Sequence, residues 1–469
     1  MKVKDKKNRN RLHKTAMLSI SLGALAACGS SSDNLDPIPS EETNIMNGTP
    51  NSDVLRGTSN NDKIIALGGD DRIFGFEGND DIYTGTGSDV VFAGTGDDTV
   101  NIEEFGNSFD GGLGTDKLVI IGFLSGVKIS VDLMRGEISG ETIPNSTTIT
   151  SFENIDASKS YGIEIISANT NNEILTGQGN DTIQLIGGTD NLISGGGSDV
   201  VTVTSGDHAI NLGEGNDHLT ITDGSHVANG GDGQDTLIFS ANNLSGQLEL
   251  DTNLEVISKN GQLLSRIENF ESFEAHTNIS VTFIGSTDGE SFLGTDQADH
   301  FKGGGGNDVY TGGLGVDSFY LTLADTSIIQ ITDFKHGVEG DILVFESSLQ
   351  VTSNNSNVEF INTNLFGKKM LNSSTDILIF TSEDGYSGTA ELLQSVNGQN
   401  GISEQTVGAL AGAQLISVWL DSSENNTKVS VLGDANRNGT FDSIYTYAAL
   451  NNEINSTLSE FSTDNFLVL

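Results

Sequence analysis

The sequence predicts an all-β fold: a parallel β-roll solenoid in which 18 residues complete one coil, with β-rich spacers between blocks of coils and a mostly β C-terminal domain. Three observations predict it. Aspartate recurs in steps of nine from Asp53 to Asp98, and an aliphatic residue stands two positions after each of them. Glycine contributes 58 residues against four prolines, a ratio suited to many tight turns. The formal net charge of −43 also excludes nucleic-acid binding through a basic surface.

Residues 1–27 have the plan of an export signal. Seven Lys and Arg residues precede an apolar stretch that is too short to span a bilayer as a mature helix, and the only cysteine follows it. The sequence Leu25-Ala26-Ala27-Cys28 resembles the lipobox of bacterial lipoproteins. That resemblance implies that Cys28 becomes the acylated first residue of the mature chain, and Gly29 after it implies the outer membrane. The alternative is a cleaved signal with an incidental cysteine. The polar stretch 28–47 is predicted to be a tether.

The nine-residue period divides the remaining chain into blocks. Three of these are predicted β-rolls, two are spacers whose alternating apolar residues predict half-buried strands and a hairpin, and the last loses the period but stays β-rich. In chain order they are β-roll 48–119, spacer 120–171, β-roll 172–238, spacer 239–284, β-roll 285–320 and C-terminal domain 321–469.

Each repeat combines a six-residue turn with a three-residue strand. Glycine at slots one, two and four adopts left-handed conformations at low cost, and the apolar centre of the strand points inward. Two turns reverse the chain twice, so each Asp stacks on the Asp 18 residues away, about 4.8 Å distant. Carboxylates that close repel each other unless a cation lies between them. Turn carbonyls add oxygen ligands, a donor set that suits calcium better than zinc or copper.

The repeat G-G-x-G-x-D-x-U-x resembles the RTX calcium-binding nonapeptide, over roughly 180 residues. The resemblance implies calcium bound between turns on the same side of the roll. The candidate calcium ligands are Asp53, Asp62, Asp71, Asp80, Asp89, Asp98 and Asp116 in the first block, Asp181, Asp190, Asp199, Asp217 and Asp235 in the second, and Asp299, Asp308 and Asp317 in the third.

One edge of the second block departs from this pattern, because its ladder runs Asp190, His208, His226. We expect calcium sites to be lost there, which leaves a stack of ions on one edge of that block. Two imidazoles without a thiolate or a further carboxylate are a weak case for a transition metal. Solvated turn residues are the favoured interpretation of these two histidines.

Aromatic residues occupy the inward slots of the third block, at Phe292, Phe301, Tyr310 and Phe319, and we expect them to fill a wider core. The loop 434–442 imitates an EF-hand loop, but Tyr445 stands at the twelfth position where a glutamate is required, so a plain hairpin turn is favoured. Segments 387–397 and 403–414 have the composition of short helices.

No H-E-x-x-H zinc motif, nucleophile motif or phosphate-binding loop occurs, so the sequence predicts no enzyme. We expect a surface-exposed outer-membrane lipoprotein, anchored by lipid, with a structural or adhesive role and with folding coupled to extracellular calcium. Surface polysaccharide and other cells are the partner classes left open. The alternatives are a type I-secreted effector or toxin, suggested by the apolar tail that resembles the signal read by type I secretion machinery, and a module related to mannuronan epimerases.

Overall fold

In a computed structural model, residues 43–469 belong to one unit of the chain. The structure describes residues 43–105, 108–121, 128–140, 146–222, 224–241, 245–322, 328–335, 340–346, 358–362, 377–381, 414–421, 426–433, 443–450 and 466–468. The predicted signal, Cys28, most of the tether, the segment 387–397 and the loop 434–442 lie outside these residues. Of the segment 403–414 only Gln414 is described, and it begins a strand.

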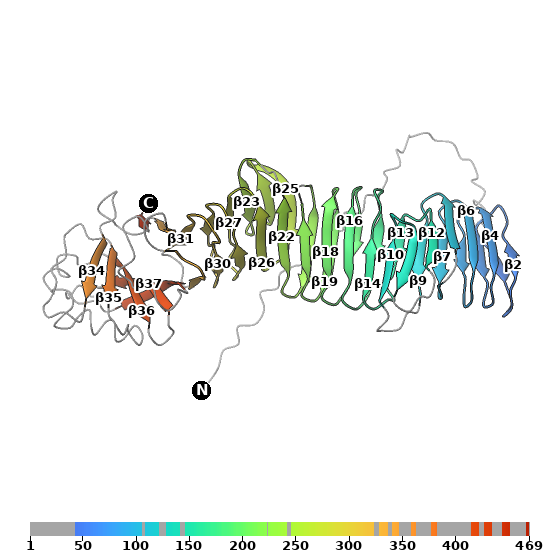
Figure 1. The fold of residues 1–469 in the computed structure, drawn as a ribbon, viewed down its shortest axis with the longest axis horizontal. Coiled ribbons are helices and arrows are strands. Elements are labelled where there is room, and N and C mark those ends of the chain that lie inside the picture. The colour runs from blue at the N-terminus through green and yellow to red at the C-terminus, as the bar shows by residue number, and fades with distance from the viewer. Residues whose placement is uncertain are drawn as a thin grey trace, which may run out of the picture. The chain divides into compact units, whose positions relative to one another are not determined.

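Strands lie side by side along the described part of the chain (Figure 1). Successive strands alternate between two sheets, except in three runs that stay in one sheet: β10–β12, β23–β25 and β34–β38. One sheet contains 18 described strands: β1 (Asn44–Asn47), β3 (Asp62–Ile65), β5 (Asp81–Tyr83), β7 (Thr99–Ile102), β9 (Lys117–Ile120), β13 (Asn154–Asp156), β15 (Glu173–Leu175), β17 (Asn191–Ile193), β19 (Ala209–Glu214), β21 (Val227–Asp232), β23 (Leu248–Asp251), β24 (Val256–Lys259), β25 (Gln262–Glu268), β27 (Val281–Ile284), β29 (His300–Lys302), β31 (Ser318–Thr322), β33 (Ile342–Glu346) and β39 (Phe466–Val468).

The other sheet contains 21 described strands: β2 (Val54–Arg56), β4 (Arg72–Glu77), β6 (Val90–Thr95), β8 (Ser108–Leu113), β10 (Ile129–Asp132), β11 (Glu137–Gly140), β12 (Thr147–Thr150), β14 (Ile163–Ile166), β16 (Thr182–Ile186), β18 (Val200–Ser205), β20 (His218–Ile221), β22 (Thr236–Ala241), β26 (Ser272–Thr277), β28 (Ser291–Leu293), β30 (Val309–Thr311), β32 (Ile329–Ile331), β34 (Val358–Asn362), β35 (Ile377–Thr381), β36 (Gln414–Asp421), β37 (Asn426–Gly433) and β38 (Ser443–Leu450).

The strand register confirms the coil of 18 residues. Parallel pairing places Leu55 beside Ile73 in one sheet and Ile64 beside Ile82 in the other. Three of these four side chains are fully buried, and Leu55 in the first coil is 8% exposed. The aliphatic residues of the repeats therefore pack into one continuous core between the two sheets. The predicted all-β solenoid is confirmed.

In the third block the inward slots hold stacked aromatic rings. Phe301 and Phe319 lie 5.0 Å apart between ring centroids, and Tyr310 lies 5.3 Å from Phe301. These side chains and Phe292 are at most 1% exposed. The prediction that they fill a wider core is confirmed, and they offer no surface on which a ligand could stack.

Both spacers contain the predicted hairpins and continue the solenoid. In the first, β10 and β11 pair antiparallel, and β12 then returns parallel to β8. In the second, β23 and β24 form the hairpin and β25 returns parallel to β21. The insertions therefore leave the coil and rejoin it at the next strand position.

In the C-terminal region the described segments are strands. β33 pairs with β31 and also, in parallel, with β39 near the chain end. β37 and β38 pair antiparallel up to Gly433 and Ser443, on either side of the EF-hand-like loop. No described segment is a helix, and hence none is a helix that could cross a membrane.

Candidate functional site

Aspartates stack in ladders along the turns of the roll. In most of them one carboxylate oxygen, Oδ1, accepts a backbone hydrogen bond from the coil before it. The backbone N–H of Asp80 donates to Asp98 Oδ1 at 2.8 Å, and that of Asp98 donates to Asp116 Oδ1 at 2.8 Å. The same bond, across 18 residues, joins Asp181 to Asp199 at 2.9 Å. Each Oδ1 thus fixes the coil before it, which places the carboxylates in register, one per coil.

The second carboxylate oxygen in these ladders is buried and without a hydrogen-bond partner. Asp98, for example, is 1% exposed, and its Oδ2 has no donor within reach. A buried carboxylate oxygen without a partner costs free energy, and a ladder of them costs more because like charges stack. The aspartates in this state are Asp71, Asp80, Asp98, Asp116, Asp181, Asp199, Asp217 and Asp235.

At Asp80, Asp116 and Asp235 a glycine five residues before the aspartate leaves the space that this oxygen faces. A Cβ at Gly75 would lie 2.2 Å from Asp80 Oδ2 and 2.3 Å from the backbone carbonyl oxygen of Ala93, one coil on. Gly57 is placed in the same way between Asp62 Oδ2 and the carbonyl of Gly75. At these glycine turns a carboxylate oxygen and a carbonyl oxygen therefore converge on one small space, and these are the ligands that calcium prefers. The donor set fits that ion.

Other aspartates find a partner for Oδ2 inside their own turn. The backbone N–H of Thr295 donates to Asp299 Oδ2 at 2.6 Å and its hydroxyl donates at 3.0 Å. Thr49 makes the same two bonds to Asp53, and Thr58 to Asp62. In these three turns threonine replaces the second glycine of the repeat, and it donates hydrogen bonds to Oδ2 of the aspartate four residues on. Calcium binding by these three aspartates stays a prediction, with a competing donor in place.

The remaining candidate ligands accept a bond from one coil before them. Asp89 Oδ1 accepts the N–H of Asp71, and Asp317 Oδ1 accepts that of Asp299. Asp308 accepts the N–H of Glu290 with one oxygen and the Tyr310 hydroxyl with the other. Among the described residues no three His, Cys, Asp or Glu side chains converge, so any metal here needs backbone oxygens as well.

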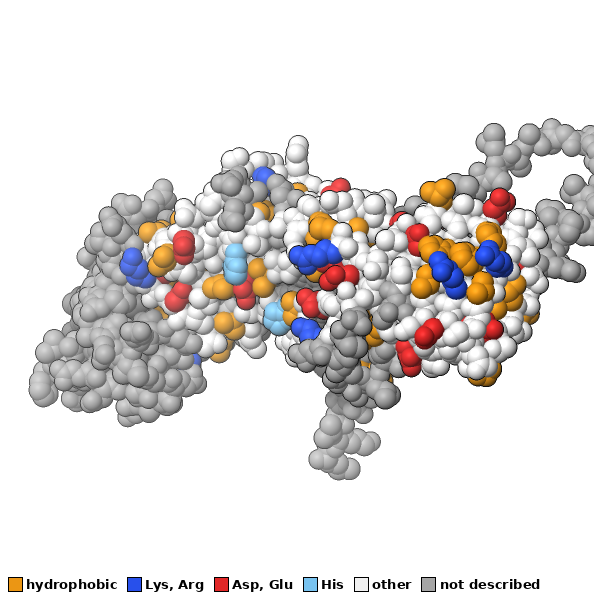
Figure 2. All heavy atoms as spheres, turned by 45° about the vertical axis from the view of Figure 1, so that its right-hand side comes forward, with side chains coloured by type: hydrophobic (Ala, Val, Ile, Leu, Met, Phe, Trp, Pro, Cys, Tyr) orange, Lys and Arg blue, Asp and Glu red, His pale blue; other side chains and the backbone are white. Residues whose placement is uncertain are grey.

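Burial raises the pKa of the eight aspartates with an unpartnered Oδ2 above the ordinary value of 3.8. The pKa of Asp80 rises to about 6, and those of Asp98 and Asp199 to about 7. Backbone N–H donation opposes this shift, and neighbouring carboxylates add to it. On the face shown in Figure 2 the Asp and Glu side chains lie in small separate areas and do not form one continuous acidic surface.

These pKa shifts predict a pH dependence for the calcium-free protein. Between about pH 4 and pH 7 the folded chain binds more protons than the unfolded chain, so its free energy of unfolding falls as pH rises through this range. We expect the chelator-treated protein to show more β-sheet circular dichroism at pH 5 than at pH 7.5. The opposite order would show that the ladders are not the dominant titrating groups.

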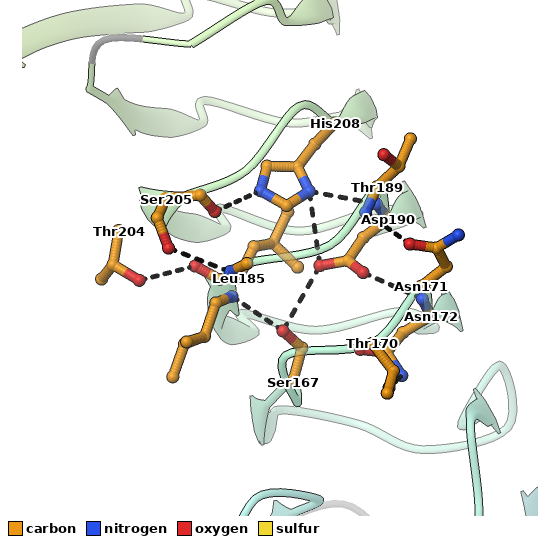
Figure 3. A network of polar contacts seen from close by, with 12 residues as sticks. Ser167, Thr170, Asn171, Asn172, Leu185, Thr189, Asp190, Thr204, Ser205 and His208 are labelled. Atoms are coloured by element: carbon orange, nitrogen blue, oxygen red, sulfur yellow. Dashed lines mark hydrogen bonds and ion pairs between the residues drawn. The ribbon is translucent and has the colours of Figure 1, made fainter.

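On the histidine edge of the second block imidazole nitrogens take positions that carboxylate oxygens hold elsewhere (Figure 3). The N–H of Asp190 donates to His208 Nδ1 at 3.1 Å, and His208 Nε2 lies 2.8 Å from the carbonyl oxygen of Ser205. Asp190 Oδ2 contacts Ser167 Oγ and His208 Nδ1, each at 3.3 Å. The imidazole thus takes the place of a carboxylate, and Asp190 has no unpartnered oxygen.

The histidines are buried, so the interpretation as solvated turn residues is wrong. His208 is 2% exposed and His226 is 1% exposed, and their rings stack at 5.6 Å. Burial, together with a smaller effect of the neighbouring His208, lowers the pKa of His226 to about 4. A ring can stack on a ring without a counter-ion when both are neutral, whereas carboxylates cannot. That difference explains why histidine is tolerated in the interior of this edge.

Calcium in the second block is therefore expected on one edge alone. We predict that Asp199→Asn removes bound calcium from the full-length protein, because it replaces an unpartnered carboxylate. Asp190→Asn is the matched control on the opposite edge and should leave the number of bound calcium ions unchanged, as measured by titration calorimetry. Equal losses in the two variants would contradict a one-sided stack.

Sequence reasoning missed three residues that continue the ladders outside the nine-residue period. Glu153 and Glu271 accept the N–H groups of Asp116 and Asp235, and Asp341 Oδ1 accepts that of Asp317. Each stands two residues before a buried strand residue or at a strand start, as in the repeats, but at separations of 37, 36 and 24 residues. The spacing to the following strand, not the period, was the signal that could have found them.

The stacked carboxylates, and the spaces beside the glycines that precede them (the glycine cradles), define a class of protein. It is a parallel β-roll whose turns offer oxygen ligands to a metal. The comparison with known families names the repeat. The chain carries four copies of the RTX calcium-binding nonapeptide repeat, at residues 47–75, 74–101, 167–201 and 284–319. No curated protein matches the chain.

Proposed function

We propose that this protein is a non-catalytic, calcium-dependent lipoprotein of the cell surface, with a structural or adhesive role. The observation that carries the calcium part is the row of buried, unpartnered Oδ2 atoms, which at Asp80, Asp116 and Asp235 face a backbone carbonyl across a glycine. Bound calcium would neutralise the stacked carboxylates. Asp80, Asp98 and Asp199 are among the residues that would hold it, through the oxygen that the fold leaves free.

Calcium binding and folding are coupled in this proposal. Without the ion, ionised carboxylates one coil apart repel and oppose stacking of the coils. Sites in extracellular modules are filled at about 10⁻⁴–10⁻³ M calcium, well above cytosolic levels. The chain would therefore stay unfolded and export-competent inside the cell, and it would fold after export, when binding free energy becomes folding free energy.

The lipid anchor rests on the N-terminal sequence, and it is tested by mass spectrometry. We expect the mature protein from fractionated outer membranes to begin at Cys28 and to carry acyl chains. Unacylated protein recovered from the culture medium would select the alternative of a type I-secreted effector.

An exposed group of phenylalanines and arginines on the first block favours the adhesive role. Phe74 stacks between Phe92 at 5.4 Å and Phe76 at 6.1 Å, and the guanidinium of Arg56 lies 4.6 Å from the Phe74 ring. Phe76 is 44% exposed and holds a backbone φ of +84°, which costs a non-glycine residue about 1 kcal/mol or more. Lys and Arg side chains among apolar ones are visible in Figure 2. Rings flanked by guanidinium groups suit an anionic polymer of sugar rings, such as an acidic surface polysaccharide.

Adhesion is tested by the double substitution Phe74→Ser and Phe92→Ser. We expect lower retention on immobilised acidic polysaccharide with an unchanged calcium-induced circular dichroism signal. Val227→Ser removes another exposed apolar side chain, 54% exposed, from the second block and serves as the control. Equal retention of all three proteins would argue for a purely structural role.

A further inference from the structure

Both spacers rejoin the solenoid through the same short sequence pattern. The first returns through Ser151-Phe152-Glu153 and the second through Asn269-Phe270-Glu271. In each, the phenylalanine is buried and the glutamate stands two residues before the inward residue of the next strand, Ile155 or Phe273. This is the position that aspartate occupies in the nonapeptide. Neither segment lies within a matched copy of the repeat.

The backbone contacts at the two junctions are also the same. The N–H of Asp116 donates to Glu153 Oε2 at 2.8 Å, and the N–H of Asp235 donates to Glu271 Oε2 at 2.8 Å. In return, the carbonyl oxygen of Asp116 accepts the N–H groups of Glu153 and the residue after it, and the carbonyl of Asp235 does the same for Glu271 and its successor. Two insertions of unrelated sequence thus converge on one geometry.

The turn at each junction is shorter than a repeat turn, which explains the residue type. In a regular coil nine residues separate successive inward positions, such as Phe109 and Leu118, whereas six separate Ile149 and Ile155. The shortened turn carries glutamate in place of aspartate, and its additional methylene lengthens the reach of the carboxylate. The ladder therefore continues through a turn that lacks the nonapeptide sequence.

Each junction presents an oxygen-lined space like those of the regular turns. Asp116 and Asp235 are fully buried, and their Oδ2 atoms have no hydrogen-bond partner. A Cβ at Gly111 would lie 2.7 Å from Asp116 Oδ2 and 2.2 Å from the carbonyl oxygen of Ser151. At Gly230 the corresponding distances are 2.7 Å to Asp235 Oδ2 and 2.1 Å to the carbonyl of Asn269.

The carbonyls reach these spaces because Ser151 and Asn269 adopt left-handed backbone conformations, with φ of +58° and +55°. Side chains other than glycine, asparagine and aspartate seldom adopt this conformation. Its occurrence at the same position of both junctions indicates that the direction of the carbonyl is the feature that each turn preserves.

We propose that Glu153 and Glu271 complete two junction calcium sites, one with Asp116 and the carbonyl of Ser151, the other with Asp235 and the carbonyl of Asn269. This inference rests on the proposed calcium-dependent function and extends it to turns outside the repeats. The junction sites attach each insertion to the roll, so that a hairpin spacer does not interrupt the row of ions.

The test is calcium stoichiometry and affinity of the full-length protein, measured by titration calorimetry with calcium chloride and by metal analysis after equilibrium dialysis. The variants are Glu153→Gln and Glu271→Gln. Glutamine can still accept the N–H bond from Asp116 or Asp235, so a merely structural glutamate would leave the calcium count unchanged. We expect each variant to lose one calcium ion per chain and the double variant to lose two. Glu268→Gln, at an exposed position three residues from Glu271, is the control and should lose none.

Asp98→Asn, within a regular ladder, separates failure of this inference from failure of the proposed function. A loss of calcium in Asp98→Asn with none in Glu153→Gln or Glu271→Gln would overturn the junction sites and leave the calcium-binding roll intact. If the unsubstituted protein bound no calcium, both proposals would be overturned.

Discussion

Removing calcium at neutral pH is expected to abolish most of the β-sheet circular dichroism of the full-length protein and to increase its hydrodynamic radius. The ladders of the first and second blocks stack carboxylates whose second oxygen has no partner, as at Asp80, Asp98 and Asp116. One site filled at 100 times its dissociation constant contributes about 2.7 kcal/mol to stability, so the loss of about six such sites exceeds the 5–15 kcal/mol that holds a typical domain together.

The control for this experiment is ionic strength. One molar sodium chloride reduces the Debye length to about 3 Å and screens the repulsion between carboxylates. It supplies no divalent cation for the buried oxygens to coordinate. We therefore expect salt to restore compactness in part and calcium to restore the β-sheet signal in full. Identical spectra in calcium and in chelator would contradict the coupling of folding to the ion.

The second large effect is expected from filling one glycine cradle. A side chain at Gly75 would collide with Asp80 Oδ2 and with the backbone oxygen of Ala93, at 2.2 and 2.3 Å. Because the carbonyl is part of the next coil, it cannot move away without disturbing the strands. We predict that Gly75→Val removes at least one bound calcium ion and lowers the free energy of unfolding by about 3 kcal/mol or more, an overpacking cost increased by the lost site.

Gly68→Ala is the matched control in the same block. The nearest atom to its Cβ is the Thr86 hydroxyl at 3.0 Å, which can rotate, and the nearest backbone atom lies at 3.6 Å. Its calcium stoichiometry should equal that of the unsubstituted protein. A Gly75→Val protein with full stoichiometry and unchanged chemical denaturation would show that the cradle is not a binding site.

Much of the fold could be predicted from the sequence because one period fixes both strand and turn. The step of nine from Asp53 to Asp98 sets the register, and the residue two positions later sets the core. The hairpin after Ile129 followed from alternation and a turn at Arg135-Gly136. These features depend on local spacing, which a single sequence carries in full.

The site was less predictable because it depends on which atoms already have partners. Thr58 and Thr295 donate to the carboxylates four residues on, a contact that competes with metal and that the period does not reveal. Burial of His208 depends on stacking with the next coil. Glu153 lies beyond a spacer that breaks the count, so it joins the ladder only once the chain is folded.

A crystal structure of the full-length protein grown in millimolar calcium tests the central claim most directly. We predict anomalous calcium density between Asp80 Oδ2 and the carbonyl of Ala93, and in the equivalent spaces along the aspartate edges, with none on the edge formed by Asp190, His208 and His226. Water or no density at the aspartate edges, in a coil of unchanged geometry, would contradict it.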